Sequence, residues 1–428
     1  MPNLPSCLPA TGADPLIPVI VGLILLVVGV SALLLLHRGR RRSGLALGLA
    51  LALVVGVGVA TAPSPAVAAE DCATIAADAP VTFSSGEVTF FGSYRAPIDP
   101  SRPVAAAVIV GGTGAVDRDG NGAGILMEEY EWLASLLADQ GFASLRYDKL
   151  GTGETGLGPY ADDPSLMLSL SYDELRIQPA RDALSFLASQ PGIDPSRLLL
   201  IGHSEGGGVT ISVAADPGSA PAPAGLLLIE PLYDRILDVI PRQFVQQIDA
   251  AVAGSAMTAP DADALKAWLA DGVDEIRTGT PPYPAPGPVP LPGATDYTAV
   301  MQSTIENNIY GVDPAQMVIS HAYRTLYGKQ FDVIEPAALA PSIAMPVLIT
   351  CGTKDFNTPC DDGAGSGVAP LAATFAPGVA RFVELQNVVH ILRDVGDNDV
   401  PSLADQVTYP FSAALAAEFS AFVAQFRD

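Results

Sequence analysis

Short apolar runs alternate with longer amphipathic stretches from about residue 81 to the C-terminus. The short runs are typical of buried strands, and the stretches with apolar positions three and four apart are typical of helices. This alternation predicts a mostly parallel sheet with helices on both faces. An initial hairpin is expected over 81–94, with its turn at Ser85-Gly86. The predicted strands are 105–110, 143–147, 198–201, 346–351 and 381–385, and the helices are 125–140 and 172–189.

The strand pattern stops after Glu230 and returns only at Pro346. The interval has helical periodicity at 236–252 and 262–276, followed by a proline-rich stretch at 281–292. We expect a helical cap inserted over a functional site, with the proline stretch as a stiff connector or lid edge. The predicted domains are a core in two parts, 70–230 and 341–428, with the cap at 231–340 between them.

The first 69 residues differ sharply from the rest. Residues 16–36 form a nearly uncharged run long enough to span a bilayer, and 44–60 form a second apolar run. The arginine cluster at 38–42 lies between them and favours the cytoplasmic side, so the second run would carry the chain outward. That run also has the features of a signal peptide, with a small-residue cleavage site near 66–68. We expect an extracytoplasmic protein, either secreted after cleavage or held at the membrane by these segments.

A short motif precedes the first apolar run. L-P-A-T-G at Leu8–Gly12 resembles the sortase recognition motif of Gram-positive surface proteins. In those proteins the motif, an apolar span and a basic tail close the chain, whereas here they open it. Two interpretations stay open: the prefix is the tail of a neighbouring coding unit or an overlong start, or it belongs to a helical hairpin anchor.

The strand at 198–201 runs into G-H-S-E-G, a turn that places Ser204 between a strand and a helix. The G-x-S-x-G turn is strained, and its glycines leave room for the chain to pass closely. The amide of Glu205 then points, with the helix N-terminus, to where a carbonyl oxygen becomes negative. The pentapeptide alone also fits an ordinary glycine-rich turn, but the apolar strand before it and the packed helix after it favour a nucleophile.

A serine nucleophile needs a base, and histidine is the side chain suited to that role near neutral pH. The chain has four histidines. His37 lies beside the first apolar run, and the side chain of His203 should diverge from its neighbour Ser204. His321 falls in the predicted cap, where a packing role is expected. His390, in a loop after the strand at 381–385, is therefore the predicted base.

The orienting acid should come from the carboxyl end of a strand, where catalytic groups of parallel sheets gather. Asp355 follows the strand at 346–351 and is the predicted acid, while Glu230 ends the preceding strand and is the alternative. Asp361 and Asp362 are expected to lie in a solvated loop.

A glycine-rich loop follows the predicted strand at 105–110. This G-G-T-G loop at Gly111–Gly114 is expected to supply the second oxyanion donor. The amide of Thr113 is the first candidate and that of Gly112 the second, and a merely flexible turn is the structural alternative.

These motifs together resemble the α/β-hydrolase superfamily, in a bacterial esterase-like branch. The resemblance covers about residue 81 to the C-terminus and rests on G-H-S-E-G-G, on V-I-V-G-G-T-G-A-V-D-R-D-G-N-G at 108–122 and on R-Y-D-K-L-G-T-G-E-T at 146–155. It implies an α/β-hydrolase fold with a helical cap, a Ser204–Asp355–His390 triad, and oxyanion amides from Thr113 and Glu205. Two segments depart from the pattern: 230–233, where a small glycine-rich turn is usual, and 387–389 before His390.

The expected reaction is hydrolysis of a small-molecule carboxylic ester through an acyl-enzyme on Ser204, with no metal and no organic cofactor. A serine peptidase or thioesterase of the same fold is the alternative, since a triad does not choose the leaving group. A non-catalytic surface binding protein is a third possibility.

A competing motif lies in the loop after the oxyanion glycines. Asp117, Asp119, Asn121, Gly122 and Glu128 match the spacing of a calcium-binding loop. Gly124 stands where a branched apolar residue is usual, and a strand rather than a helix leads in. A loop that braces the rim of the active site is the preferred interpretation.

Charge and cysteine content bear on the possible partners of the protein and on the state of its thiols. The net charge is −24, and from residue 70 onward 18 basic and 45 acidic residues leave a surface that repels nucleic acid. Cys351 and Cys360 bracket Asp355 and can pair in an exported protein, which would contribute about 2 to 3 kcal/mol in the chain-entropy model. The alternative is two free buried thiols, and Cys72 would be left unpaired.

Overall fold

The computed structural model describes residues 74–122, 124–278 and 330–427. The chain divides into two compact units, Met1–Cys72 and Ala73–Asp428, and the described residues belong to the second.

Several predicted segments lie outside the described residues. They include the apolar runs at 16–36 and 44–60, the Leu8–Gly12 motif, His321 and the proline-rich stretch at 281–292. Across the described ranges, no helix is both long and apolar enough to cross a membrane.

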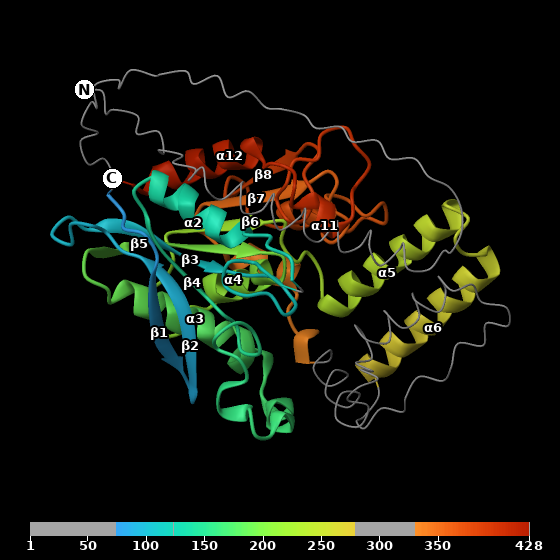
Figure 1. Cartoon of the computed structure of the whole chain (residues 1–428), viewed down its shortest axis with the longest axis horizontal. Coiled ribbons are helices and arrows are strands. Elements are labelled where there is room, and N and C mark those ends of the chain that lie inside the picture. The colour runs from blue at the N-terminus through green and yellow to red at the C-terminus, as the bar shows by residue number, and fades with distance from the viewer. Residues whose placement is uncertain (1–73, 123, 279–329, 428) are drawn as a thin grey trace, which may run out of the picture. The chain divides into compact units, whose positions relative to one another are not determined.

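One eight-stranded sheet organises the second unit, in the order β1-β2-β4-β3-β5-β6-β7-β8 (Figure 1). The β1–β2 and β2–β4 pairs are antiparallel, and every other neighbouring pair is parallel. This is the mostly parallel sheet expected from the sequence. The strands are β1 (Ala79–Ser85), β2 (Val88–Arg95), β3 (Val104–Val110), β4 (Ala143–Tyr147), β5 (Ile193–His203), β6 (Gly225–Ile229), β7 (Val347–Gly352) and β8 (Ala380–Leu385).

Helices cover both faces of this sheet. α2 (Glu129–Asp139) and α12 (Ala413–Val423) pack on one face, and α3 (Gln178–Ala188), α4 (Glu205–Ala215) and α10 (Val368–Ala372) pack on the other (Figure 1). Successive residues of a strand point to opposite faces, so both faces must be apolar. On β3, Ala106, Val108 and Val110 join the core under α3 and α4, while the residues between them join the core under α2 and α12.

The fold is therefore an α/β-hydrolase fold, as the sequence predicted. The shorter described elements complete it without changing the layers. They are 3₁₀ turns at Gly158–Tyr160, Pro164–Ser169, Ala340–Ser342 and Ala424–Phe426, a π-helical turn at Asp173–Ile177, and the short helices α9 (Pro336–Leu339) and α11 (Leu403–Gln406).

One predicted helix begins later than the periodicity suggested, and another contains a π-helical turn. The prediction of 125–140 was wrong at its start, because Glu128 has a positive φ of 60° and donates its N–H to Asn121 Oδ1, so α2 begins only at Glu129. The prediction of 172–189 is divided into the π-helical turn and α3. Pro179, which has no N–H to donate, lies in the first turn of α3.

The interval between β6 and β7 contains α5 (Ile236–Ala253) and α6 (Ala259–Thr278), close to the two helices predicted for the cap. These helices pack against each other, and a buried aspartate ties them to the chain that returns to the core. Arg235 and Arg277 each place a guanidinium nitrogen 2.8 Å from Asp332 Oδ2. Asp332 Oδ1 also accepts a hydrogen bond from the Leu237 amide. We call this group the Asp332 latch.

The junction between β5 and α4 is packed backbone against backbone. A Cβ at Gly206 would overlap the carbonyl oxygen of Val110 in β3, and a Cβ at Gly202 would overlap the carbonyl oxygen of Gly206. Only glycine lets the strand and the helix approach this closely. Gly208, one residue beyond this contact zone, differs because a Cβ there would meet mainly the flexible end of Leu232.

The steric contrast predicts different outcomes for two neighbouring substitutions. Gly206→Ala should lower the free energy of unfolding by about 3 kcal/mol or more, because a backbone carbonyl cannot move away. Gly208→Ala should change it by less than about 1 kcal/mol, since alanine also favours the helix. Denaturant unfolding of both variants tests this, and equal stabilities would show that the close approach is not rigid.

Candidate active site

Ser204 lies at the turn from β5 into α4 and has a strained backbone. Its φ of 55° and ψ of −125° are unusual for a residue with a side chain. The Ser204 amide donates to the carbonyl of Ile229 in β6, and the Ser204 carbonyl accepts from the amide of Leu232. These bonds fix the turn that the G-x-S-x-G spacing predicted, at the carboxyl end of the parallel strands.

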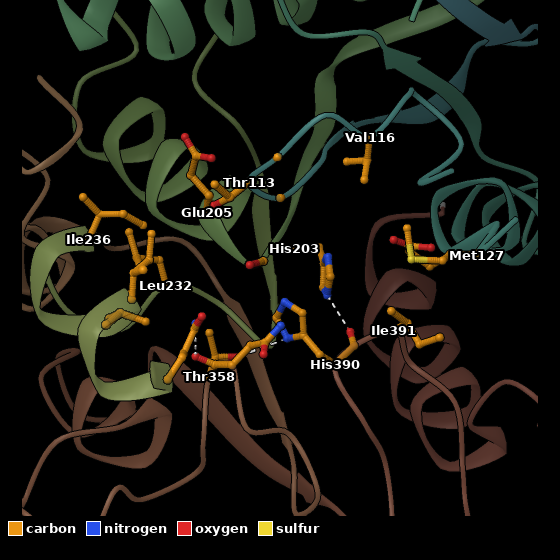
Figure 2. Close-up of a pocket in the computed structure, with 18 of the residues that line it drawn as sticks. Thr113, Val116, Met127, His203, Glu205, Leu232, Ile236, Thr358, His390 and Ile391 are labelled. Carbon is orange, nitrogen blue, oxygen red and sulfur yellow. Dashed lines mark hydrogen bonds between the residues drawn. The ribbon is translucent and has the colours of Figure 1, made fainter. Parts of the chain in front are cut away.

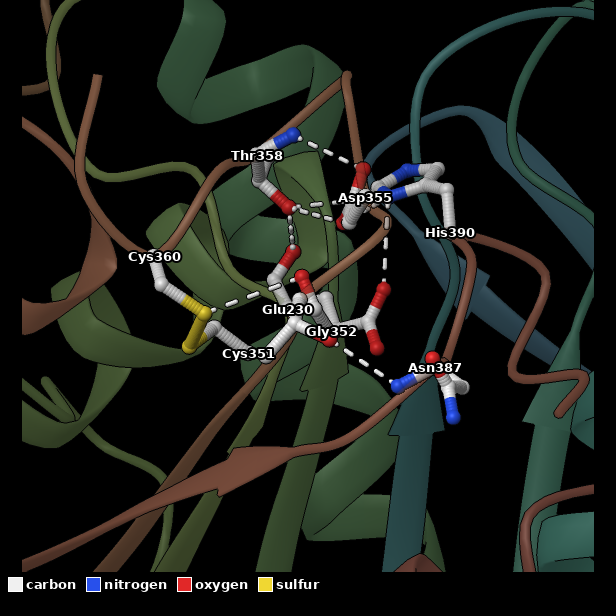
Figure 3. Close-up of a disulfide and its surroundings, with 9 residues drawn as sticks. Glu230, Cys351, Gly352, Asp355, Thr358, Cys360, Asn387 and His390 are labelled. Carbon is white, nitrogen blue, oxygen red and sulfur yellow. Dashed lines mark hydrogen bonds and ion pairs between the residues drawn. A yellow bond between two sulfur atoms is a disulfide. The ribbon is translucent and has the colours of Figure 1, made fainter. Parts of the chain in front are cut away.

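His390 and Asp355 meet at the same edge of the sheet. His390 Nδ1 is 2.7 Å from Asp355 Oδ2, so the ionised carboxylate accepts the Nδ1 proton and leaves Nε2 with its lone pair. Glu230, the alternative acid, is farther away, with Oε2 3.7 Å from the same Nδ1 (Figure 3). The structure thus brings together both predicted acids and favours Asp355 by distance.

The loop after β7 holds the Asp355 carboxylate in place. Asp355 Oδ1 accepts from the amides of Asn357 and Thr358, and the Thr358 hydroxyl is 2.7 Å from Oδ2. Burial alone would raise the pKa of Asp355, but the His390 imidazole and hydrogen bonds to the side chains of Glu230 and Thr358 hold the pKa well below its usual value. Asp355 is therefore charged at neutral pH.

A disulfide between Cys351 and Cys360 closes the same loop (Figure 3). These are the two cysteines that the sequence suggested as a pair. A cross-link across so short a segment restricts the loop that carries the acid.

The acidic residues beyond this loop differ in part from the prediction. Asp361 is exposed, as expected, but the prediction of a solvated Asp362 was wrong. The Asp362 side chain is only 4% exposed and lies 3.4 Å from Arg242 of α5, because the loop turns back toward the cap.

Two backbone amides that the sequence suggested as oxyanion donors have no acceptor among the described residues. Within the described residues, neither the Thr113 amide nor the Glu205 amide makes a hydrogen bond. The Gly112 amide, the second sequence candidate, donates to Tyr130 Oη at 2.8 Å and is not free. The loop still passes close to the nucleophile, since a Cβ on Gly112 would lie 2.8 Å from Ser204 Cβ. The geometry favours Thr113 over Gly112 as donor.

A buried histidine, His203, makes a hydrogen bond to the loop that carries His390. The sequence analysis missed this role. His203 Nε2 is 2.9 Å from the carbonyl oxygen of His390, and His203 Nδ1 is 3.0 Å from Tyr130 Oη (Figure 2). Burial, together with the nearby His390 imidazole, lowers the pKa of His203 to about 3, so the ring is neutral. A carbonyl only accepts, so Nε2 carries the proton and Nδ1 accepts from Tyr130.

The sequence predicted that the side chain of His203 diverges from Ser204. It carried no signal that this side chain would reach the loop of His390. A series of hydrogen bonds runs from the Gly112 amide through Tyr130 Oη and the His203 ring to the His390 carbonyl. It links the loop after β3 to the loop that carries His390.

The site opens into a pocket of about 330 Å³ that contains both Ser204 and His390 (Figure 2). In the described part of the chain both side chains line this pocket, and no hydrogen bond joins them. The pocket wall is mostly apolar and comes from α5 and the adjoining loops. Its apolar members are Val116, Met127, Leu232, Ile236, Val239, Ile240, Phe244, Ile391 and Leu403.

The acidic loop at 117–121 is braced by the protein itself. Asp117 Oδ1 accepts from the amides of Asp119 and Asn121, and Asp119 Oδ1 accepts from Arg146 Nε. Arg118 binds Asp148 through both its amide and its guanidinium. Oxygens of Asp117 and Asp119 are thus paired with donors of the protein, which fits the preferred interpretation of a structural brace.

One group of side chains in the described residues is close enough to hold a metal ion: His203, Glu230 and His390, whose ligand atoms lie within 4.8 Å of one another. Both ring nitrogens of His203 already have partners, and His390 Nδ1 donates to Asp355. A metal needs free lone pairs on its ligands. This donor set suits proton transfer better than metal binding.

Comparisons with known proteins bear on the fold. No protein-family model and no curated protein sequence matches the chain. Solved structures similar to it include Est1E from Butyrivibrio proteoclasticus with ferulic acid bound (12% identity, 81% of this chain and 98% of that chain, TM-score 0.46). Another similar structure is proline iminopeptidase from Mycobacterium smegmatis (14% identity, 81% of this chain and 98% of that chain, TM-score 0.46). A third is the esterase domain of a Rhodothermus marinus protein (16% identity, 81% of this chain and 98% of that chain, TM-score 0.42). At these identities and scores the likeness assigns no activity, and the fold class rests on the strand order above.

The pocket also contains a buried carboxyl whose ionisation should affect stability. Glu129 is 3% exposed, and burial raises its pKa to about 8. An acid whose pKa is raised in the folded state is protonated there while the unfolded chain is ionised, so this group lowers stability progressively as pH rises from about 4.5 to 8.

Glu129→Gln should remove this loss because the amide stays neutral. The melting temperature of the variant should exceed that of the wild type by several degrees at pH 8 and by much less at pH 5. Glu128→Gln, at an exposed neighbouring position, is the matched control and should follow the wild type. Parallel curves of melting temperature against pH for wild type and Glu129→Gln would contradict the prediction.

Proposed function

We propose that this protein is a serine hydrolase that cleaves carboxylic esters through an acyl-enzyme on Ser204. The observation that supports it most directly is the 2.7 Å contact between His390 Nδ1 and Asp355, in the pocket where Ser204 lies at a strained strand-to-helix turn. A carboxylate that orients an imidazole in the same pocket as a partly exposed serine is the arrangement needed for nucleophilic catalysis.

The proposed reaction has two halves. His390 Nε2 takes the Ser204 proton as Oγ bonds to the ester carbonyl carbon, and the carbonyl oxygen becomes negative. The amides of Thr113 and Glu205 donate to this oxygen, with the positive end of α4 behind them. The intermediate then expels the alcohol, which takes the proton from His390, and water cleaves the acyl-enzyme by the same steps. Asp355 stabilises the charged imidazolium throughout, and no cofactor is needed.

The walls of the pocket favour an ester with an apolar group. The side chains of α5 that line it, together with Met127 and Ile391, offer little to bind a charged substituent. The burial of an apolar acyl or alkoxy group against them would contribute about 25 cal/mol for each Å² removed from water. A small-molecule ester is therefore the proposed substrate.

Ser204→Ala tests the assignment, because removal of the nucleophile should lower turnover of nitrophenyl esters at least about 10³-fold and abolish labelling by a fluorophosphonate. The fold should remain, as judged by the melting temperature. Ser189→Ala, at an exposed serine, is the control and should retain full labelling. Turnover by Ser204→Ala at the wild-type rate would reject the proposal.

The same assay separates the related chemistries. A panel of nitrophenyl esters, thioesters and aminoacyl amides should show the highest kcat/KM for the esters. Preferential cleavage of aminoacyl amides or thioesters would instead identify a peptidase or thioesterase with the same catalytic residues.

We further propose that the protein acts outside the cytoplasm. The disulfide between Cys351 and Cys360 and the apolar, arginine-flanked N-terminal sequence support this location. Expression of the full chain in a secreting bacterium should give activity outside the cytoplasmic fraction, either as a chain that begins near residue 69 or as a membrane-held form. Active protein that keeps its N-terminus and its free thiols in the cytosolic fraction would contradict this.

A further inference from the structure

A second acid lies beside the catalytic pair and has no task in the mechanism above. Glu230 follows β6, has a positive φ of 47° and is completely buried. Its carboxyl interacts with the Asp355 carboxylate and lies 3.7 Å from His390 Nδ1. The burial of one acid against another is costly, so its position calls for a physical reason.

Its position follows from the register of the sheet. Ile229 of β6 pairs with Thr350 of β7, so the residues just beyond the two strands reach the same edge. Glu230 and Asp355 therefore approach one imidazole from neighbouring strands. Gly352 makes room for this, because a Cβ there would lie 2.9 Å from Glu230 Oε1.

The two acids carry one negative charge between them. Burial raises the pKa of Glu230 well above its usual value, and the adjacent Asp355 carboxylate raises it further, while the pKa of Asp355 is held low. Two carboxylates this close do not both ionise. The other titratable groups facing Glu230 are His390 and the neutral His203. Glu230 is thus protonated while Asp355 is charged.

The distances indicate what Glu230 can do. Its Oε2 is 3.7 Å from His390 Nδ1, against 2.7 Å for Asp355 Oδ2. A shift of about one ångström would bring Oε2 within hydrogen-bond distance of Nδ1. We propose that Glu230 is a reserve positioning acid, which holds the His390 imidazole when the Asp355 carboxylate is withdrawn. This inference rests on the proposed function, since it concerns the same imidazole.

The proton balance is simple. When Asp355 is removed, the like charge that kept Glu230 protonated disappears. The Glu230 carboxyl releases its proton to solvent, and the resulting carboxylate accepts the Nδ1 proton of His390. The imidazole keeps the tautomer in which Nε2 is the base, so the acyl-transfer steps are unchanged.

Four variants test this by ester hydrolysis: Glu230→Gln, Asp355→Ala, the double variant Asp355→Ala/Glu230→Gln, and the control Asp355→Ala/Asp361→Asn. Glu230→Gln alone should lower kcat much less than Asp355→Ala does, because Asp355 still holds the imidazole. Asp355→Ala should lose about 10²- to 10³-fold in kcat, less than the about 10⁴-fold lost when an orienting acid is disabled without a substitute.

The decisive comparison is between the kcat of the double variant and the kcat of Asp355→Ala. It should fall at least tenfold below Asp355→Ala in kcat, with KM unchanged, whereas the Asp361 control should equal Asp355→Ala because that carboxyl is exposed. The kcat of Asp355→Ala should also rise with pH as Glu230 ionises, and this rise should be missing in the double variant. A purely structural role for Glu230 would move stability but not this rise.

One further measurement distinguishes a failure of the proposed function from a failure of the reserve acid. The Nδ1–H proton of His390 should give a downfield NMR signal in wild type and in Asp355→Ala, and not in the double variant. A wild-type enzyme without turnover would reject the proposed function but leave this signal as a test of the reserve acid. If Asp355→Ala does not fold, Asp355→Ser, whose hydroxyl can accept from the amides of Asn357 and Thr358, takes its place. Equal kcat and equal Nδ1 signals in the single and double variants would overturn the inference.

Discussion

The close approach of α4 to β5 and β3 is the constraint on which the site depends. Because Gly202 and Gly206 have no side chains, the helix begins directly beneath the carboxyl ends of two parallel strands. Ser204 is forced to a positive φ at the junction, and the first amide of α4 faces the pocket. The loop after β3 also reaches the serine through a glycine, Gly112. Ser204 and the loop after β3 thus meet at the sheet edge with no side chain between their backbones.

Two neighbouring imidazoles have opposite properties because their surroundings differ. The ring centroids of His203 and His390 are 4.7 Å apart. His203 is enclosed, neutral and bonded at both nitrogens, so it acts as a rigid spacer between Tyr130 and a backbone carbonyl. His390 is partly exposed, and a carboxylate holds only one of its nitrogens. Burial and hydrogen bonds at both ring nitrogens therefore distinguish His203 from His390.

Local patterns predicted the fold and the three residues of the proposed triad, because each depends on a strand and the turn that follows it. Ser204, Asp355 and His390 each follow an apolar run, and parallel strands bring such positions to one edge. The Tyr130–His203–His390 connection could not be predicted in this way, since it joins residues 73 and 187 positions apart. The late start of α2 was missed because it depends on a turn at Glu128 that hydrophobic periodicity does not encode. The pairing of Asp362 was missed because it depends on a contact with Arg242, which is distant in the sequence.

The Asp332 latch has a consequence for how a substrate enters. One nearly buried carboxylate receives two guanidinium groups and a backbone amide, so lifting α5 away from the core would expose and unpair several charges together. A substrate would then be selected by whether it fits through the entrance of a preformed pocket. Closure of the protein around a bound ligand would play no part in this selection.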